Sequence, residues 1–170
     1  MVYVSLLSGC KDSEPEDIDR DLRIYNLNFV FEDKDGNNLV EKIEAGTNQS
    51  GNIYNIDPYA YKMTLTMGDR TITTPKYDLL GLGKSENGNF LSWTEVTLEQ
   101  PLYKKIEMTL SFKQIFGNTD IHTIISDWEQ PDILNRPECK KVTFDGKEYP
   151  VTYNKDMRCD LVIITVDNQK

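Results

Sequence analysis

The sequence predicts an all-β fold in which two sheets pack face to face as a sandwich. Three observations support this prediction. Apolar and polar residues alternate with a period of two in several short segments, as in half-buried strands. Gly, Asn, Asp and Pro separate these segments at short intervals. No stretch sustains the 3.6-residue period of an amphipathic helix, and a chain of 170 residues has the length of one domain.

Three segments show the alternation most plainly. In chain order their core-facing residues are expected to be Tyr25, Leu27, Phe29 and Phe31, then Tyr61, Met63, Leu65 and Met67, then Ile106, Met108, Leu110 and Phe112. The polar residues between them take the opposite face, because successive side chains of a strand point to opposite sides of the sheet. In the first segment these are Asn26 and Asn28.

The segment from Asp120 to Trp128 is the one place where a short helix is expected. Further along, residues 142–149 predict a hairpin with Asp145 and Gly146 at the turn, because a type I′ turn needs positive φ at both central positions. Pro150 confines the strand around it to an edge or a bulge, which lets the last strand cross to the facing sheet. Residues 161–166 are apolar on both faces and typical of a central strand. Together these elements favour a sandwich of immunoglobulin or transthyretin type.

The charge of the chain excludes one class of partner. The formal net charge is -9 and the pI about 4.6, so nucleic acid would be repelled. Beyond residue 10 no apolar run approaches the roughly 20 residues that a membrane-spanning helix needs.

A short apolar run at the start of the chain ends in a cysteine. Leu7, Ser8, Gly9 and Cys10 resemble the lipobox of bacterial lipoproteins, in which an apolar residue and two small ones precede the cysteine that receives the lipid. The resemblance implies a signal-peptide remnant at residues 1–9, a lipidated Cys10 with an acidic tether at residues 10–21, and a sandwich domain at residues 22–170. Residues 1–7 lack a basic residue and a full apolar core, so a truncated start is expected. The alternative is an ordinary N-terminal strand with a chance cysteine.

The residues after Cys10 are strongly acidic. Like charges with Pro15 among them, and no apolar residue before Ile18, predict an extended tether. A lysine followed by acidic residues also resembles the surface-export signal of Bacteroidota lipoproteins, with a solvating linker as the alternative. The overall pattern resembles small outer-membrane lipoproteins of Bacteroidota. It implies a lipid-anchored protein at the cell surface, and it assigns a role to no residue except Cys10.

Two further cysteines head strands near the end of the chain. Cys139 and Cys159 form an even pair once Cys10 carries lipid. The sequence allows two states: a disulfide between these cysteines, or two buried thiols. In a simple three-strand meander their ends would lie about 10 Å apart, too far for a bridge, whereas a crossing to the facing sheet would permit one.

Few residues offer recognisable catalytic or cofactor chemistry. Asp33, Asp35, Asn37 and Glu44 fall at positions 1, 3, 5 and 12 of an EF-hand calcium loop. The flanking segments are strand-like, so a hairpin turn is the preferred interpretation and calcium the weaker one. The single histidine, His122, is expected to be structural, and Gly83-Lys84-Ser85 lacks the first glycine of a P-loop. No cofactor is expected.

Four aromatic residues are candidates for ligand binding. Tyr59, Tyr61, Trp93 and Trp128 are candidates to bind a glycan, although tyrosine and tryptophan in sandwiches more often fill the core. The sequence therefore favours a non-catalytic, lipid-anchored binding module for a glycan or an envelope protein. Two alternatives stay open: an adhesin-like subunit that assembles through edge strands, and a hydrolase that uses a carboxylate pair.

Overall fold

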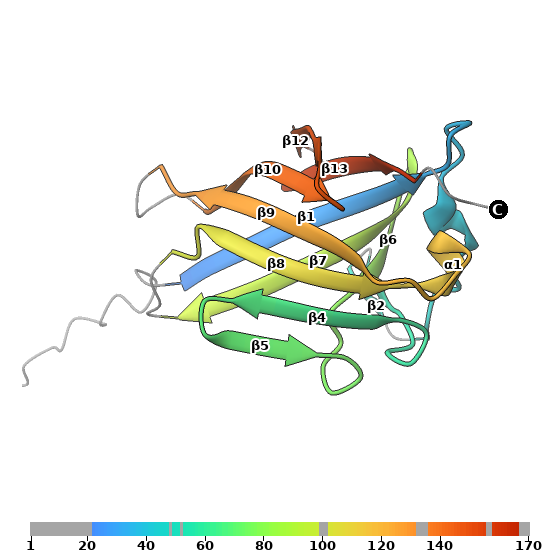
Figure 1. Cartoon of the computed structure of the whole chain (residues 1–170), viewed down its shortest axis with the longest axis horizontal. Helices are drawn as coiled ribbons and strands as arrows, with labels where there is room; N and C mark the ends of the chain where they lie inside the picture. Colours follow the sequence, from blue (N-terminus) through green and yellow to red (C-terminus); the bar gives the residue numbers. More distant parts are fainter. Residues whose placement is uncertain are drawn as a thin grey trace, which may run out of the picture.

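The computed structural model of the chain describes residues 22–47, 49–51, 53–98, 102–131, 136–155 and 158–166. These residues form a sandwich of two sheets, and Figure 1 shows the sheets as two layers. In spatial order the seven-stranded sheet holds β12 (Val151–Asn154), β13 (Cys159–Thr165), β1 (Leu22–Glu32), β7 (Gly88–Leu98), β6 (Gly81–Ser85), β3 (Ile53–Asn55) and β2 (Gln49–Ser50). The six-stranded sheet holds β11 (Lys147–Tyr149), β10 (Glu138–Phe144), β9 (His122–Glu129), β8 (Lys105–Ser111), β4 (Lys62–Met67) and β5 (Arg70–Thr73). The prediction of an all-β sandwich is confirmed.

The core lies between the two sheets and is made by the alternation that the sequence shows. The twelve residues predicted to face inward in the three alternating segments are all buried, with at most 3 % of any side chain exposed. Trp128 packs edge-on against Tyr25, with ring centroids 5.2 Å apart, and against Trp93 at 6.1 Å. These rings come from both sheets, so aromatic contacts fasten one sheet to the other.

The prediction of a helix at residues 120–128 was wrong, because most of that segment belongs to strand β9. Ile124, Ser126 and Trp128 are buried and alternate with more exposed neighbours, which is a period of two. The one α-helix of the described residues is α1 (Lys113–Phe116), which ends at Gly117 with a φ of 75°. It contacts a short 3₁₀ helix, η2 (Leu39–Lys42), at one end of the sandwich (Figure 1). None of the described helices has the length and apolar character needed to cross a membrane.

The chain changes sheets at Pro150. The hairpin of β10 and β11 turns at Asp145 and Gly146, whose φ values of 48° and 82° fit the predicted type I′ turn. Strand β11 ends the six-stranded sheet at Tyr149, and β12 begins the edge of the other sheet at Val151. The predicted crossing is therefore confirmed.

Strand β13 lies inside the seven-stranded sheet, as predicted for residues 161–166, and pairs in parallel with β1. All other pairs of strands among the described residues are antiparallel. The two faces of β13 differ, since Val162 and Ile164 are buried whereas 47 % of Ile163 is exposed on the outer face.

Candidate functional site

The outer face of the seven-stranded sheet carries a polar strip at its centre. Strand β1 lies between β13 and β7, and its outward residues Asn26 and Asn28 form the middle of this strip. The register places Thr94 opposite Asn26 and Ser92 opposite Asn28 on β7. The two strands β1 and β7 thus bring amide and hydroxyl side chains side by side on one surface.

A groove of about 610 Å³ runs over this strip. Its lining combines the polar strip with the turn between β6 and β7, part of β3 and the ends of β12 and β13. The described lining residues are Asn26, Asn28, Ile53, Lys84, Ser85, Glu86, Asn87, Phe90, Ser92, Thr94, Asn154 and Cys159. We call this feature the outer-face groove.

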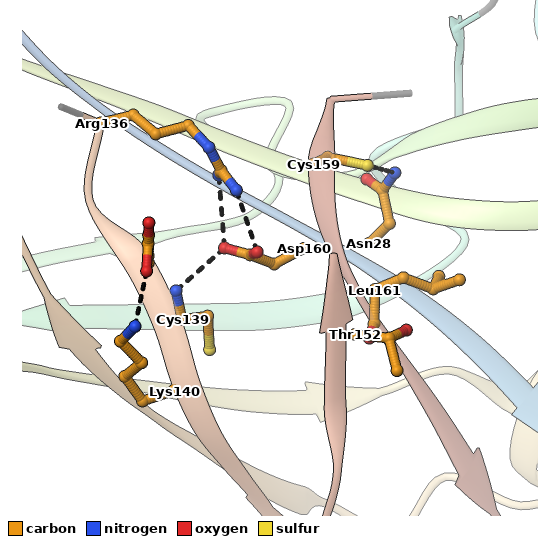
Figure 2. A network of polar contacts seen from close by, with 9 residues as sticks. Asn28, Arg136, Cys139, Lys140, Thr152, Cys159, Asp160 and Leu161 are labelled. Atoms are coloured by element: carbon orange, nitrogen blue, oxygen red, sulfur yellow. Dashed lines mark hydrogen bonds and ion pairs between the residues drawn. The ribbon is translucent and has the colours of Figure 1, made fainter. Parts of the chain in front are cut away.

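Asn28 is the most buried polar residue of the outer-face groove, with 3 % of its surface exposed. Its amide nitrogen donates a hydrogen bond to Sγ of Cys159 at 2.9 Å, as Figure 2 shows. The side-chain oxygens of Asn28 and Asn26 are buried and accept no hydrogen bond from any described residue. A buried acceptor without a partner costs about 1–3 kcal/mol, so each oxygen would gain from a donor supplied by a ligand.

Two glycines shape the apolar side of the groove. A Cβ at Gly83 would lie 2.1 Å from the ring of Phe90, and one at Gly81 would lie 2.3 Å from Cγ2 of Ile53. The glycines of β6 therefore let Phe90 and Ile53 lie flat against the outer face of the sheet. Only 4 % of Phe90 is exposed, so this ring forms the floor of the groove and offers no open aromatic surface.

The turn at the β6 end of the groove is fixed by η2 and by the residue before it. The backbone N–H of Asn89 donates to Oε1 of Glu41 at 2.7 Å, and Nδ2 of Asn38 donates to the carbonyl oxygen of Asn89 at 2.8 Å. Within the turn, Oγ of Ser85 donates to the carbonyl oxygen of Gly88. The two charged residues in the described lining of the groove are Lys84, near the end of β6, and Glu86, in this turn.

Next to the opposite end of the groove, an ion pair joins the two sheets. Arg136 donates two hydrogen bonds to the carboxylate of Asp160, at 3.0 and 3.3 Å, and the backbone N–H of Cys139 donates to the same carboxylate at 2.9 Å (Figure 2). Asp160 belongs to β13 and Cys139 to β10, so these contacts span the sandwich. We call this cluster the inter-sheet clasp. It lines a second cavity of about 620 Å³, where Arg136 also lies 4.7 Å from the ring centroid of Tyr153.

Of the two alternatives that the sequence leaves open for Cys139 and Cys159, the structure has free, buried thiols. Burial, helped by the charge of Asp160, raises the pKa of Cys139 to about 12 and that of Cys159 to about 11. Both thiols are therefore protonated at neutral pH, and neither has the thiolate character of a nucleophile.

His122 lies in a smaller pocket of about 230 Å³, at the turn between β10 and β11. Its ring packs between Phe116 and Phe144, with centroids 4.0 and 5.2 Å away. Nδ1 lies 2.7 Å from Oδ2 of Asp145, whose other oxygen accepts from the backbone N–H of Thr123. The histidine thus links the hairpin turn to β9, while its Nε2 is buried without a hydrogen-bond partner among the described residues.

Three of the four aromatic candidates lie in the core, and their prediction as ligand-binding residues was wrong. Tyr61, Trp93 and Trp128 are at most 3 % exposed, because each occupies an inward position of its segment. The hydroxyl of Tyr61 accepts hydrogen bonds from the backbone N–H groups of Leu79 and Leu80. Tyr59 differs, since 81 % of it is exposed in the loop before β4, away from the outer-face groove.

The calcium candidates form a turn closed on itself. Oδ1 of Asp33 accepts from the backbone N–H groups of Asp35 and Asn37, and the Asn37 side chain donates to both carboxylate oxygens. These bonds lower the pKa of Asp33, the side-chain bond from Asn37 most of all. Glu44 follows η2, and no hydrogen bond between described residues joins it to this turn. Within that part of the chain no three His, Cys, Asp or Glu side chains gather as a metal site.

Sequence reasoning missed the outer-face groove, although one signal for it was visible. Asn26 and Asn28 are two large amides on the outward face of a strand whose inward face is fully aromatic or aliphatic. The contributions of β6, β7 and β13 depend on strand order, which the sequence does not reveal. Cys10 and the acidic tether lie outside the described residues.

Comparisons with protein-family models, with curated proteins and with solved structures found no match for this chain.

Proposed function

We propose that this protein is a lipid-anchored lipoprotein of the bacterial outer membrane, facing the cell surface, whose sandwich is a non-catalytic binding module for a glycan or an envelope protein. The outer-face groove carries the binding role, because two of its amide oxygens accept no hydrogen bond from a described residue. A ligand O–H or N–H group bonded to them would offset part of the cost of their burial.

The location rests on the lipobox resemblance of Leu7 to Cys10. Several acyl chains on Cys10 anchor a protein stably, since each buried methylene contributes about 0.8 kcal/mol. The tether at residues 10–21 leads directly into β1, the strand that carries Asn26 and Asn28. The anchor and the groove are thus linked by one continuous segment.

The contacts give less support to the two alternatives. A hydrolase of the expected kind needs two facing carboxylates, and Glu86 is the one carboxylate among the described residues lining the groove. The second cavity has two, Glu138 and Asp160, and each is ion-paired, with Lys140 and Arg136 respectively. An adhesin-like subunit needs an edge strand that accepts a partner strand. The edge strands β12, β2, β11 and β5 have four, two, three and four residues, and short edges limit such pairing.

A binding experiment with the full chain tests the proposal. Envelope extract of the native host is separated into polysaccharide and protein fractions, and each is applied to immobilised protein. We expect one fraction to bind the wild-type chain and Thr94→Trp to weaken that binding at least tenfold, because Thr94 is exposed at the groove. The matched control is Thr109→Trp, on the outer face of the six-stranded sheet, which should bind as the wild type does. Equal binding by all three chains, or none by the wild type, contradicts the proposal.

A further inference from the structure

We infer that the ligand of the outer-face groove is a neutral, hydroxyl-rich oligosaccharide, held by hydrogen bonds to amide and hydroxyl side chains without aromatic stacking. This inference rests on the proposed binding function and specifies its ligand.

The side chains of the polar strip are uncharged and suit a sugar. Asn26, Asn28, Ser92 and Thr94 offer donors and acceptors without charge. A sugar hydroxyl both donates and accepts, so one hydroxyl can satisfy an amide oxygen and a neighbouring hydroxyl together. A peptide main chain offers one donor and one acceptor per residue, and strands usually recognise it through a free edge rather than through the face of a sheet.

The charges in and around the groove favour a neutral ligand. Lys84 and Glu86 are the two charged residues in the described lining, and their charges are opposite. The whole chain has a formal net charge of -9, which repels uronic acids and sulfated sugars at moderate ionic strength. Arginine, the usual partner of carboxylate and sulfate groups, does not occur among the described lining residues. A neutral ligand avoids this repulsion.

The position of Asn28 and the width of the sheet also bear on the ligand. The amide oxygen of Asn28 lies beneath the surface of the groove. A ligand reaches this oxygen only when the amide turns partway about the Cβ–Cγ bond, which breaks the hydrogen bond from Nδ2 to Sγ of Cys159. That torsion is soft in asparagine. The four strands from β13 to β6 span about 14 Å at a strand spacing of about 4.8 Å, which suits an oligosaccharide better than a single sugar.

The described lining of the groove offers a sugar no open aromatic ring. Phe90 is the one aromatic residue of the described lining, and its ring is covered. The aromatic residues that the sequence nominated for a sugar platform lie in the core, apart from Tyr59. Affinity therefore depends on hydrogen bonds, and substitution of the amides should lower it more than substitution of Tyr59.

The experiment measures binding of the full chain to mannan, dextran and arabinogalactan as neutral probes. Polygalacturonate, chondroitin sulfate and a mixed peptide pool serve as the competing classes. We expect at least one neutral polysaccharide to bind and the anionic ones to fail. Asn28→Leu should weaken that binding at least tenfold, and Ser92→Ala should weaken it severalfold. Tyr59→Ala and Thr109→Ala should leave it unchanged.

Asn28 is buried, so its variant is checked for an unchanged unfolding midpoint, and Asn26→Leu, at a half-buried position, provides a second test of the amides. Binding of only anionic probes or peptides, lost in Thr94→Trp, overturns the neutral-glycan inference while the binding function stands. Binding of a neutral probe that survives Asn26→Leu and Ser92→Ala overturns the assignment of the groove as its site. Failure of every probe and of the envelope fractions overturns both.

Discussion

The two buried cysteines show how one residue type takes its properties from its surroundings. Cys139 is packed in the core near the Asp160 carboxylate, and burial holds its pKa near 12 instead of the ordinary 9.0. Burial keeps each thiol protonated at neutral pH. The sequence allowed a disulfide between Cys139 and Cys159, but in the structure the Arg136–Asp160 ion pair of the clasp joins the two sheets at this place.

The raised pKa makes a prediction about stability at alkaline pH. The folded state holds the Cys139 proton more tightly than the unfolded state, so the unfolded chain is favoured as pH rises from about 9 towards about 12. Relative to Cys139→Ala, the wild type should lose about 1 kcal/mol between pH 9 and 10, and the loss should approach about 1.4 kcal/mol per pH unit above pH 10. Urea unfolding of both proteins at pH 8, 9 and 10 measures the difference. A wild-type advantage that stays constant with pH would contradict the prediction.

At the residue scale, the sequence identified side-chain type better than side-chain role. Trp93 and Trp128 were reasonable ligand candidates by type, but the inward face of a strand is decided by neighbours on other strands. Asn28 was placed on the correct face by alternation. Its burial depends on Cys159, which meets it through the parallel pairing of β1 and β13 at opposite ends of the described chain.

At the element scale, the inter-sheet clasp holds β10 against β13 where the chain has changed sheets. Asp160 is 4 % exposed and serves Arg136 and the Cys139 N–H together. A buried carboxylate with both partners in place is costly to remove, because its partners stay behind without a counter-charge.

Removing the Asp160 charge should therefore destabilise the fold. We expect Asp160→Asn to lower the free energy of unfolding by about 2 kcal/mol, below the full cost of breaking a buried pair because solvent still reaches Arg136. The control is Glu148→Gln, which breaks the exposed pair with Lys141 and should cost less than about 1 kcal/mol. Urea denaturation of the three proteins decides the matter. Equal losses in the two variants would show that the clasp is no more than a surface contact.

The elements themselves were largely predictable where alternation was strong. Strands β1, β4 and β8, the hairpin at Asp145 and the crossing at Pro150 all follow from period and turn chemistry. Strand β9 was missed because Asp120 to Trp128 mixes isoleucine, threonine and charged residues without a clean alternation. Strand β6 is rich in glycine, so its pairing could not be read from its own residues.

At the scale of the whole molecule, the proposal joins an anchor, a tether and a sandwich. Two packed sheets were predictable, since many short strands must bury one face each. The order of strands was not, because it depends on pairings between distant segments, and the outer-face groove is a product of that order.

The anchor makes its own prediction. In the native host, Cys10→Ser should move the protein from the membrane fraction to the soluble fraction, because the serine hydroxyl cannot receive the thioether-linked lipid. Fractionation and intact-mass measurement follow the change. The matched control is Cys159→Ser, a buried thiol of the sandwich, which should remain in the membrane fraction. A wild-type protein that is soluble and unmodified at Cys10 contradicts the lipoprotein assignment.

The central claim is that the outer-face groove binds the ligand through Asn26 and Asn28. Nuclear magnetic resonance of the ¹⁵N-labelled full chain tests it most directly, with the neutral polysaccharide or envelope fraction that binds added stepwise. The account predicts that the side-chain amide signals of Asn26 and Asn28 shift as binding saturates, while that of Asn118, at the far pocket beside His122, stays in place. Saturable binding that leaves the Asn26 and Asn28 signals unchanged and shifts signals elsewhere would contradict it.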